Sequence, residues 1–128
     1  VARRKFERTD KGTFIASETH GNYPHAMIEV AKKLNLPYID LSTLSREYLT
    51  QIGPEKSKDL YMNLEKNIYD VYPEGKEDNT HLKPLGAYTF AKMIAQEILK
   101  INDKNYQKLK DALCFNKTID YTECTNAD

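Results

Sequence analysis

The sequence predicts an α/β fold, of which this chain carries only a part. Stripes of apolar residues recur along it at helical spacing, and one short apolar run between two stripes has the character of a buried parallel strand. No second complete strand is recognisable. Because a parallel sheet needs neighbouring strands and helices on both faces, we expect the chain to be a fragment of such a domain or to dock onto the rest of one.

The N-terminal residues predict the end of a strand followed by a loop. Residues 1–4 pass from apolar to basic side chains, and a strand that begins at residue 1 predicts that earlier strands are missing from this sequence. The first residue is Val rather than Met, so we expect that a targeting segment or a longer N-terminal part has been removed. Residues 5–22 are polar and rich in Gly, Thr and charge, which predicts a long surface loop.

A helix and the recognisable strand follow. The helix is predicted over residues 23–35, because its apolar residues return at helical spacing: Ala26, Met27, Val30, Ala31 and Leu34. Asn35 ends it. Residues 36–41 form the short apolar run that suits a buried parallel strand.

Two further helices precede an irregular stretch. Ser42 or Thr43 can cap the first of them, whose apolar side consists of Leu44, Tyr48, Leu49 and Ile52. Gly53 closes that helix, and Pro54 opens a shorter one that ends near residue 62. Residues 63–80 show no clear period and contain a proline and a glycine, so they are predicted to be loop.

The strongest helix prediction lies after this loop. Its apolar stripe consists of Ala87, Phe90, Ala91, Ile94, Ala95, Ile98 and Leu99. Pro84 falls near the first turn, a position that proline favours. After Ile101 the chain becomes polar, with a short helix predicted near residues 105–113 and an irregular tail beyond it.

Composition argues against two classes of function. The chain has 19 basic and 19 acidic residues and a formal net charge of zero, unlike the basic surfaces that bind nucleic acids. It contains no run of about 18 apolar residues, so we predict no membrane-spanning helix. With 40% apolar and 30% charged residues it has the composition of a globular protein.

The two cysteines leave two interpretations open. Cys114 and Cys124 lie close together near the C-terminus. They form a local disulfide if the protein is exported and remain free thiols otherwise, because the sequence does not fix their redox state.

A metal site is conceivable from spacing alone, but we do not expect one. His25 and Glu29 stand four residues apart on a predicted helix, with His20 nearby, a spacing that can hold zinc. Two histidines and one carboxylate around a loop more often serve packing and solvation. We therefore predict no metal and no cofactor.

Asp78 and His81 have the clearest chemical role. A carboxylate three residues before a histidine, in a turn, can accept a hydrogen bond from one ring nitrogen and leave the other free to act as a base toward a nucleophile. In the serine-protease template, spoiling this carboxylate lowers turnover by about 10⁴. The alternative is a capping Asp beside an exposed His, because the bare pattern also arises by chance.

The blocks around this pair resemble those of the SGNH (GDSL-type) hydrolases, and most closely their rhamnogalacturonan acetylesterase-like branch. In that family an Asp-x-x-His block lies near the C-terminus just ahead of the last helix, as Asp78-Asn79-Thr80-His81 does here before Gly86-Ala87. Upstream blocks match in the same order: Ala2-Arg3-Arg4-Lys5-Phe6, Thr19-His20-Gly21-Asn22-Tyr23-Pro24, Pro37-Tyr38-Ile39-Asp40-Leu41, Gly53-Pro54-Glu55-Lys56-Ser57 and Tyr72-Pro73-Glu74-Gly75-Lys76.

The resemblance implies a three-layer α/β/α, flavodoxin-like fold with a parallel sheet. Residues 1–101 would be the C-terminal half of this hydrolase domain, and residues 102–128 a C-terminal extension. It also implies a secreted or periplasmic esterase that removes acetyl groups from plant polysaccharides such as rhamnogalacturonan or xylan. In this chain the resemblance makes His81 the general base and Asp78 its orienting carboxylate.

Three further residues are predicted to contact the polysaccharide. His20 lies, in the related enzymes, in a loop toward the active-site side, although it can equally be an ordinary histidine of a surface loop. Arg4 follows the first strand at its carboxyl end, where open α/β sheets bind ligands, although it or Arg3 can instead pin the loop. Tyr72, like Tyr69, lies beside the motif and can stack on a sugar ring, although tyrosines in long loops commonly cover a core.

The family's nucleophile has no counterpart in these residues. It lies in an N-terminal Gly-Asp-Ser block, and the oxyanion hole adds a Gly and a Gly-x-Asn block, none of which occurs here. We therefore expect the serine to lie in a missing N-terminal half of the same domain, and the isolated chain to be nearly inactive. That half, and a second copy of the chain, are the expected protein partners.

Two alternatives remain. The first is a non-catalytic esterase-like module that binds a glycan or a partner, which a Gly-Asp-Ser block encoded upstream would argue against. The second is an unrelated α/β domain with a chance motif, which predicts that Asp78 and His81 lie beyond hydrogen-bonding distance.

Overall fold

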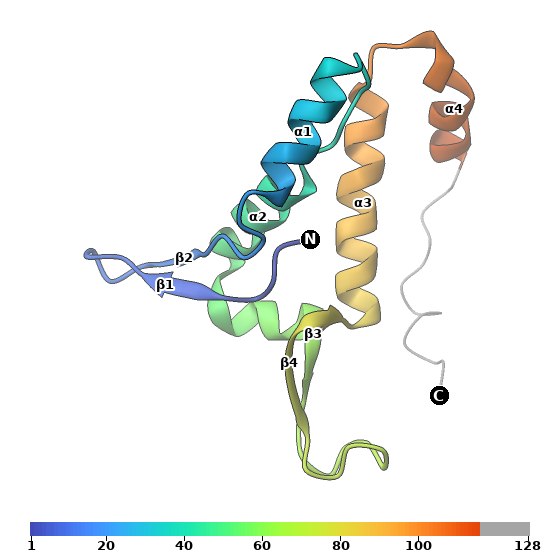
Figure 1. The fold of residues 1–128 in the computed structure, drawn as a ribbon. Coiled ribbons are helices and arrows are strands. Elements are labelled where there is room, and N and C mark those ends of the chain that lie inside the picture. Colours follow the sequence, from blue (N-terminus) through green and yellow to red (C-terminus); the bar gives the residue numbers. More distant parts are fainter. Residues whose placement is uncertain (116–128) are drawn as a thin grey trace.

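The computed structural model describes residues 1–115, which form four α-helices and two separate two-stranded sheets (Figure 1). The helices are α1 (Tyr23–Lys33), α2 (Leu41–Lys56), α3 (Pro84–Lys100) and α4 (Gln107–Phe115), with 3₁₀ turns η1 (Ser57–Leu60) and η2 (Lys104–Tyr106). The strands are β1 (Phe6–Arg8), β2 (Phe14–Ala16), β3 (Tyr61–Leu64) and β4 (Lys76–Leu82). In Figure 1 the two hairpins, β1–β2 and β3–β4, project away from the helices.

The predicted helices are confirmed with small shifts at their ends, except the short helix predicted from Pro54 to near residue 62. There α2 continues to Lys56, the 3₁₀ turn η1 follows, and residues 61 and 62 belong to β3. Helix α1 stops at Lys33, and Asn35 follows in a left-handed conformation with φ 50°. Helix α2 begins one residue before the predicted caps, because the Asp40 side chain accepts a hydrogen bond from the Thr43 backbone N–H at 3.0 Å. Such an N-cap contributes about 1 kcal/mol to helix stability. Gly53, at φ 79° and ψ 176°, interrupts α2 as predicted.

The predictions of loop at residues 5–22 and 63–80 are wrong, since each stretch contains strands of an antiparallel hairpin. Strand β1 pairs with β2 in the register Phe6 opposite Ala16, and β3 pairs with β4 in the register Tyr61 opposite Leu82. Strands β1 and β2 have three residues each and are largely exposed, so they show no alternation of buried apolar and exposed polar side chains. Backbone pairing alone defines them.

The predicted parallel sheet is absent from residues 1–115, where the observed sheets are antiparallel. The strand predicted over residues 36–41 is also wrong: residues 36–40 belong to no strand, and α2 begins at Leu41. Residues 1–4 form no strand either. A strand is defined by its ladder, and no other described segment pairs with these residues. The described chain is thus a mixed α/β structure.

The core is small and lies where α2, α3, η1 and β3 meet. Leu49, Tyr61 and Phe90 are its largest fully buried side chains, and the Phe90 ring contacts the Tyr61 ring edgewise at 6.4 Å between centroids. The Tyr61 hydroxyl donates a hydrogen bond to the Ala2 carbonyl, which fastens the N-terminal segment to this core. Burial raises the pKa of Tyr61 to about 12, because the charged phenolate is poorly solvated there. This packing fixes the start of α3 against β3 and β4.

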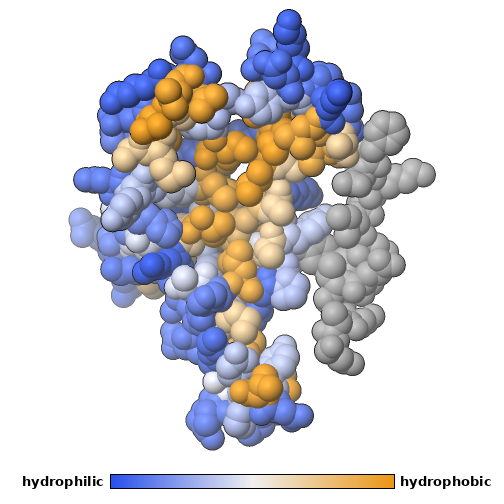
Figure 2. Space-filling model, turned by 45° about the vertical axis from the view of Figure 1, so that its right-hand side comes forward, coloured by the Kyte–Doolittle hydropathy of each residue, from blue (hydrophilic) through white to orange (hydrophobic). Residues whose placement is uncertain are grey.

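Many large apolar side chains outside this core are exposed on the surface. Figure 2 shows them gathered in a continuous band down one face of the molecule. On α1 and the segment after it, the exposed large apolar residues are Tyr23, Met27, Val30, Leu34, Leu36 and Tyr38. In the predicted stripe of α3, only Phe90 is buried. A face of this kind marks a contact with further protein or a ligand. Across residues 1–115, none of the helices combines the length and apolar character of a bilayer crossing.

Candidate active site

Asp78 and His81 lie in a bulge of strand β4. Tyr61 of β3 is paired with Leu82, and Asn63 of β3 with Glu77, so between these pairs β3 advances by two residues and β4 by five. The surplus residues of β4 therefore form an irregularity within the strand over residues 78–81, which we call the 78–81 bulge. Bulges commonly re-aim side chains next to active sites.

The bulge joins the two side chains directly. Oδ2 of Asp78 lies 2.8 Å from Nδ1 of His81, and Oδ1 of Asp78 accepts hydrogen bonds from the backbone N–H groups of Thr80 and His81, both at 2.9 Å. An ionised carboxylate can only accept, so Nδ1 of His81 carries the proton and Nε2 presents a lone pair. Within residues 1–115, Nε2 of His81 has no hydrogen-bond partner. The His81 side chain is 76% exposed and that of Asp78 only 14%. The geometry is that of a base oriented by a carboxylate.

The surroundings keep Asp78 ionised. The hydrogen bond from the His81 backbone N–H, then that from Thr80, and then the imidazole hold the pKa of Asp78 well below its usual range. Lys76, with Nζ 3.4 Å from Oδ2 of Asp78, acts in the same direction, and desolvation opposes it. Asp78 is therefore a permanent anion near neutral pH, as an orienting carboxylate must be.

This depressed pKa predicts how the bulge responds to acid. Because the folded-state pKa lies below the unfolded value of about 3.9, the Asp78 contacts stabilise the folded state above about pH 4, and this contribution is lost progressively below it. A ¹³C NMR titration of the Asp78 carboxyl carbon should give a midpoint well below 3.9. The Asp78→Asn variant should lose the corresponding pH dependence of stability. A midpoint at or above 3.9 would contradict the geometry.

The Arg4 side chain lines a surface hollow together with Asn79 and Thr80, and it is held by contacts within the protein. Its guanidinium donates to the Ser57 hydroxyl at 3.1 Å, to Oδ1 of Asn79 at 2.8 Å and to the Pro54 carbonyl at 2.7 Å. Each of its three nitrogens is thus engaged within the protein. Contact of Arg4 with a polysaccharide stays a prediction.

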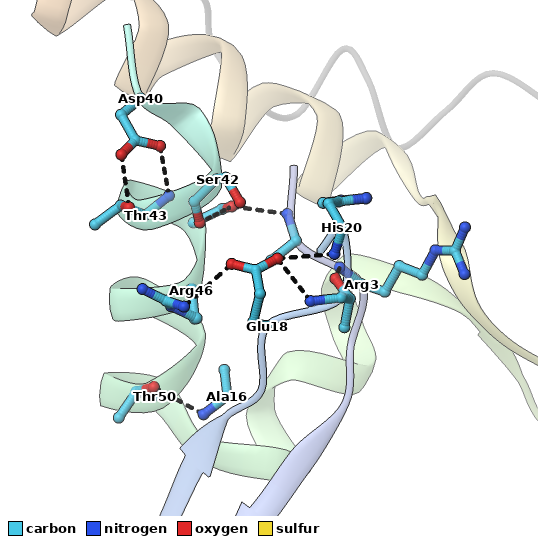
Figure 3. A network of polar contacts seen from close by, with 12 residues as sticks. Arg3, Ala16, Glu18, His20, Asp40, Ser42, Thr43, Arg46 and Thr50 are labelled. Atoms are coloured by element: carbon cyan, nitrogen blue, oxygen red, sulfur yellow. Dashed lines mark hydrogen bonds and ion pairs between the residues drawn. The ribbon is translucent and has the colours of Figure 1, made fainter. Parts of the chain in front are cut away.

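His20 lies in a second polar network, at the loop that follows β2 (Figure 3). Its Nε2 donates to the Val1 carbonyl at 2.8 Å, and its backbone N–H donates to the Glu18 carboxylate at 2.7 Å. Glu18 also pairs with Arg46 of α2 at 3.1 Å, and its pKa is lowered, chiefly by the bond from the His20 backbone. In Figure 3 the Arg3 side chain points away from this network. His20 thus ties the N-terminal segment to its loop, and its substrate role stays a prediction.

Tyr72 lies near the tip of the β3–β4 hairpin and reaches the site through Lys76. Nζ of Lys76 lies 5.0 Å from the centre of the Tyr72 ring and 3.4 Å from Oδ2 of Asp78. The sequence offered no reason to single out Lys76, because residues 63–80 were predicted to be loop. As a strand, β4 carries residues 76 and 78 on one face. Stacking of Tyr72 on a sugar stays a prediction.

The other candidate groups do not converge. Nε2 of His25 lies 3.3 Å from Glu29 in an exposed pair on α1. Among the residues that the structure describes, no three His, Cys, Asp or Glu side chains gather as metal ligands. The proposed Cys114–Cys124 disulfide involves Cys124, which lies outside the described residues.

None of the serines in the chain is set up as a nucleophile for His81. Ser45 and Ser57 are fully buried, and each is hydrogen-bonded to backbone carbonyls of α2. The hydroxyls of Ser17 and Ser42 are buried without a hydrogen-bond partner within residues 1–115. An activated serine instead lies within hydrogen-bond reach of its base and faces the substrate.

Comparison with known proteins finds that the chain is homologous to an SGNH hydrolase, as the motif blocks predicted. The relative is rhamnogalacturonan acetylesterase RhgT of Bacillus subtilis (strain 168), with 39% identity over 98 residues, or 77% of this chain and 40% of RhgT. The chain therefore spans less than half the length of this relative. No family model matches the chain, and no solved structure gives a significant match.

Proposed function

We propose that this chain supplies the base and its orienting carboxylate to a carbohydrate O-acetylesterase whose serine lies outside these 128 residues. The observation that carries the proposal is the hydrogen bond between Asp78 and Nδ1 of His81, which leaves an exposed Nε2. Homology to a protein named as a rhamnogalacturonan acetylesterase favours an acetylated polysaccharide as the substrate.

The proposed reaction follows the serine-hydrolase scheme. Nε2 of His81 takes the proton of the serine hydroxyl as the serine oxygen attacks the acetyl carbonyl, and Asp78 stabilises the imidazolium that forms. His81 then protonates the departing sugar oxygen, leaving an acetyl-serine. Water, deprotonated by His81, hydrolyses this ester and restores the serine.

Two surface features support the proposal, one for packing of further protein and the other for binding of a sugar. The apolar face of α1 and residues 36–38 offers a place for more of the same domain to pack. A hollow of about 480 Å³ lies beside the 78–81 bulge, and its lining includes Lys5, Thr19 and Thr80, whose polar groups suit sugar hydroxyls.

The test compares this chain alone with the same chain extended by its native upstream residues. The chain alone should hydrolyse p-nitrophenyl acetate no faster than buffer, because it lacks a nucleophile and oxyanion donors. The extended protein should hydrolyse it and should release acetate from acetylated rhamnogalacturonan. An extended protein that binds the polysaccharide but releases no acetate would favour a non-catalytic module.

A further inference from the structure

A bulge needs new partners for the backbone groups that it removes from the ladder. Residues 78–81 lie outside the regular pairing of β4 with β3, so their backbone groups can bond to other parts of the chain. The Asn79 carbonyl accepts a hydrogen bond from the Arg4 backbone N–H at 2.8 Å. The Asp78 carbonyl is within 3.4 Å of the Asn63 side-chain amide. The backbone of the N-terminal segment therefore supplies a hydrogen bond to β4 that strand β3 does not supply.

Arg4 contacts the bulge a second time through its side chain. Its guanidinium donates to Oδ1 of Asn79, the residue between Asp78 and Thr80, at 2.8 Å. The same guanidinium is anchored on the opposite side by Ser57 at the start of η1 and by the Pro54 carbonyl of α2. Arg4 thus makes two hydrogen bonds to Asn79 and two to residues of η1 and α2. It connects these elements to the bulge.

We propose that Arg4 is a positioning residue, which sets the Asp78–His81 pair at the angle needed for proton transfer by clamping Asn79 between them. The inference rests on the proposed function, which gives that pair its chemical role. No hydrogen bond joins Arg4 to the side chain of Asp78 or His81, so it acts through the backbone of the bulge. This role differs from the substrate contact expected at this residue.

Lysine cannot replace arginine in this position. The guanidinium is a planar fork whose separate nitrogens donate in fixed, divergent directions, and here they reach three acceptors on two sides. A lysine side chain ends in one ammonium nitrogen. In this geometry that nitrogen cannot donate to both Oδ1 of Asn79 and the Pro54 carbonyl. Arg4→Lys keeps the positive charge and removes the clamp.

The first measurement uses the 128-residue chain, labelled with ¹⁵N and ¹³C. In the unsubstituted chain, the His81 ring should be held as the Nδ1–H tautomer and the Asp78 carboxyl should titrate well below pH 3.9. In Arg4→Lys the Nδ1–H form should lose population and the Asp78 midpoint should move upward. Arg3→Lys is the matched control: the Arg3 side chain makes no hydrogen bond or ion pair within residues 1–115, so both signals should stay unchanged.

The second measurement uses the extended, active protein. Arg4→Lys should lower kcat about tenfold with KM unchanged, because a displaced base slows the chemical step and leaves binding intact. If Arg4→Lys fails to fold, Asn79→Ala carries the test, since it removes the side-chain acceptor and keeps the bond from Arg4 N–H to the Asn79 carbonyl. It should shift the same two NMR signals in the same direction.

The outcomes separate the two proposals. If the tautomer, the Asp78 midpoint and kcat all stay unchanged in Arg4→Lys or Asn79→Ala, the positioning role is overturned. A rise in KM with unchanged kcat would also overturn it, in favour of substrate binding by Arg4. If the NMR signals respond as expected while the extended protein has no esterase activity, the positioning role stands and the proposed function fails.

Discussion

Replacing His81 with Ala in the extended protein is expected to lower kcat for acetyl ester hydrolysis by about 10⁴ to 10⁶. Nε2 of His81 is the exposed basic atom of the pair, and without it the serine hydroxyl has no acceptor for its proton. Asp78→Asn should lower kcat by about 10⁴. An amide NH₂ in place of the carboxylate favours the wrong tautomer of His81 and cannot stabilise the imidazolium. Initial rates on p-nitrophenyl acetate measure both.

His25→Ala is the control for this experiment. His25 is also an exposed histidine beside a carboxylate, with Nε2 3.3 Å from Glu29, but it lies on α1. Its removal should leave the rate within about twofold of the unsubstituted protein. A loss of less than about tenfold in His81→Ala would mean that another group is the base, and would remove His81 from the mechanism.

Gly86→Ala is expected to destabilise the chain by about 3 kcal/mol or more, a large fraction of the stability of a small domain. A Cβ at residue 86 would lie 2.1 Å from the Leu60 carbonyl oxygen and 2.9 Å from its carbon, and both are backbone atoms. That carbonyl also accepts a hydrogen bond from Lys83 N–H at 3.0 Å. Helix α3 must therefore move away from η1 and β3, which the midpoint of urea unfolding would report.

Ala87→Gly is the neighbouring control, and it tests the opposite change at an exposed position of the same helix. It should cost only about 1 kcal/mol, the ordinary penalty of glycine in a helix interior. If Gly86→Ala cost no more stability than this, α3 would be able to move away from Leu60 without destabilising the chain. The contact between Gly86 and Leu60 would then not determine the position of the site. Because residue 83 adjoins β4, we also expect Gly86→Ala to disturb the His81 ring signals.

The helices were predictable because their evidence is local. The stripe of α3 repeats along one continuous segment, and Pro84 marks its start without reference to any other part of the chain. The hairpins were not predictable, because backbone partners define the pairing of β1 with β2, and two strands of three residues are too short to show an alternating pattern. The apolar run over residues 36–41 was visible, but apolar character alone does not make a strand where no described segment pairs with it.

The candidate site, like the fold, was predictable only in part. The contact between Asp78 and His81 was predictable because a carboxylate three residues before a histidine can reach the imidazole, and the resemblance of the surrounding blocks singled out this pair. Lys76, Asn63 and the clamp by Arg4 were missed, because each depends on the register shift between β3 and β4. A shift of that kind is set by packing between segments far apart in the chain, and the sequence around residue 78 carries no sign of it.

The hydrogen bonds of the 78–81 bulge have a consequence for timing. They link residues of this chain only, from Arg4 to His81, so the imidazole is aligned when the chain folds and not when a nucleophile arrives. The conformational entropy of fixing the ring is then lost during folding, and none of it adds to the activation barrier. In the proposed esterase, an incoming serine would therefore meet a preorganised base, and assembly would have to fix only the position of the serine itself.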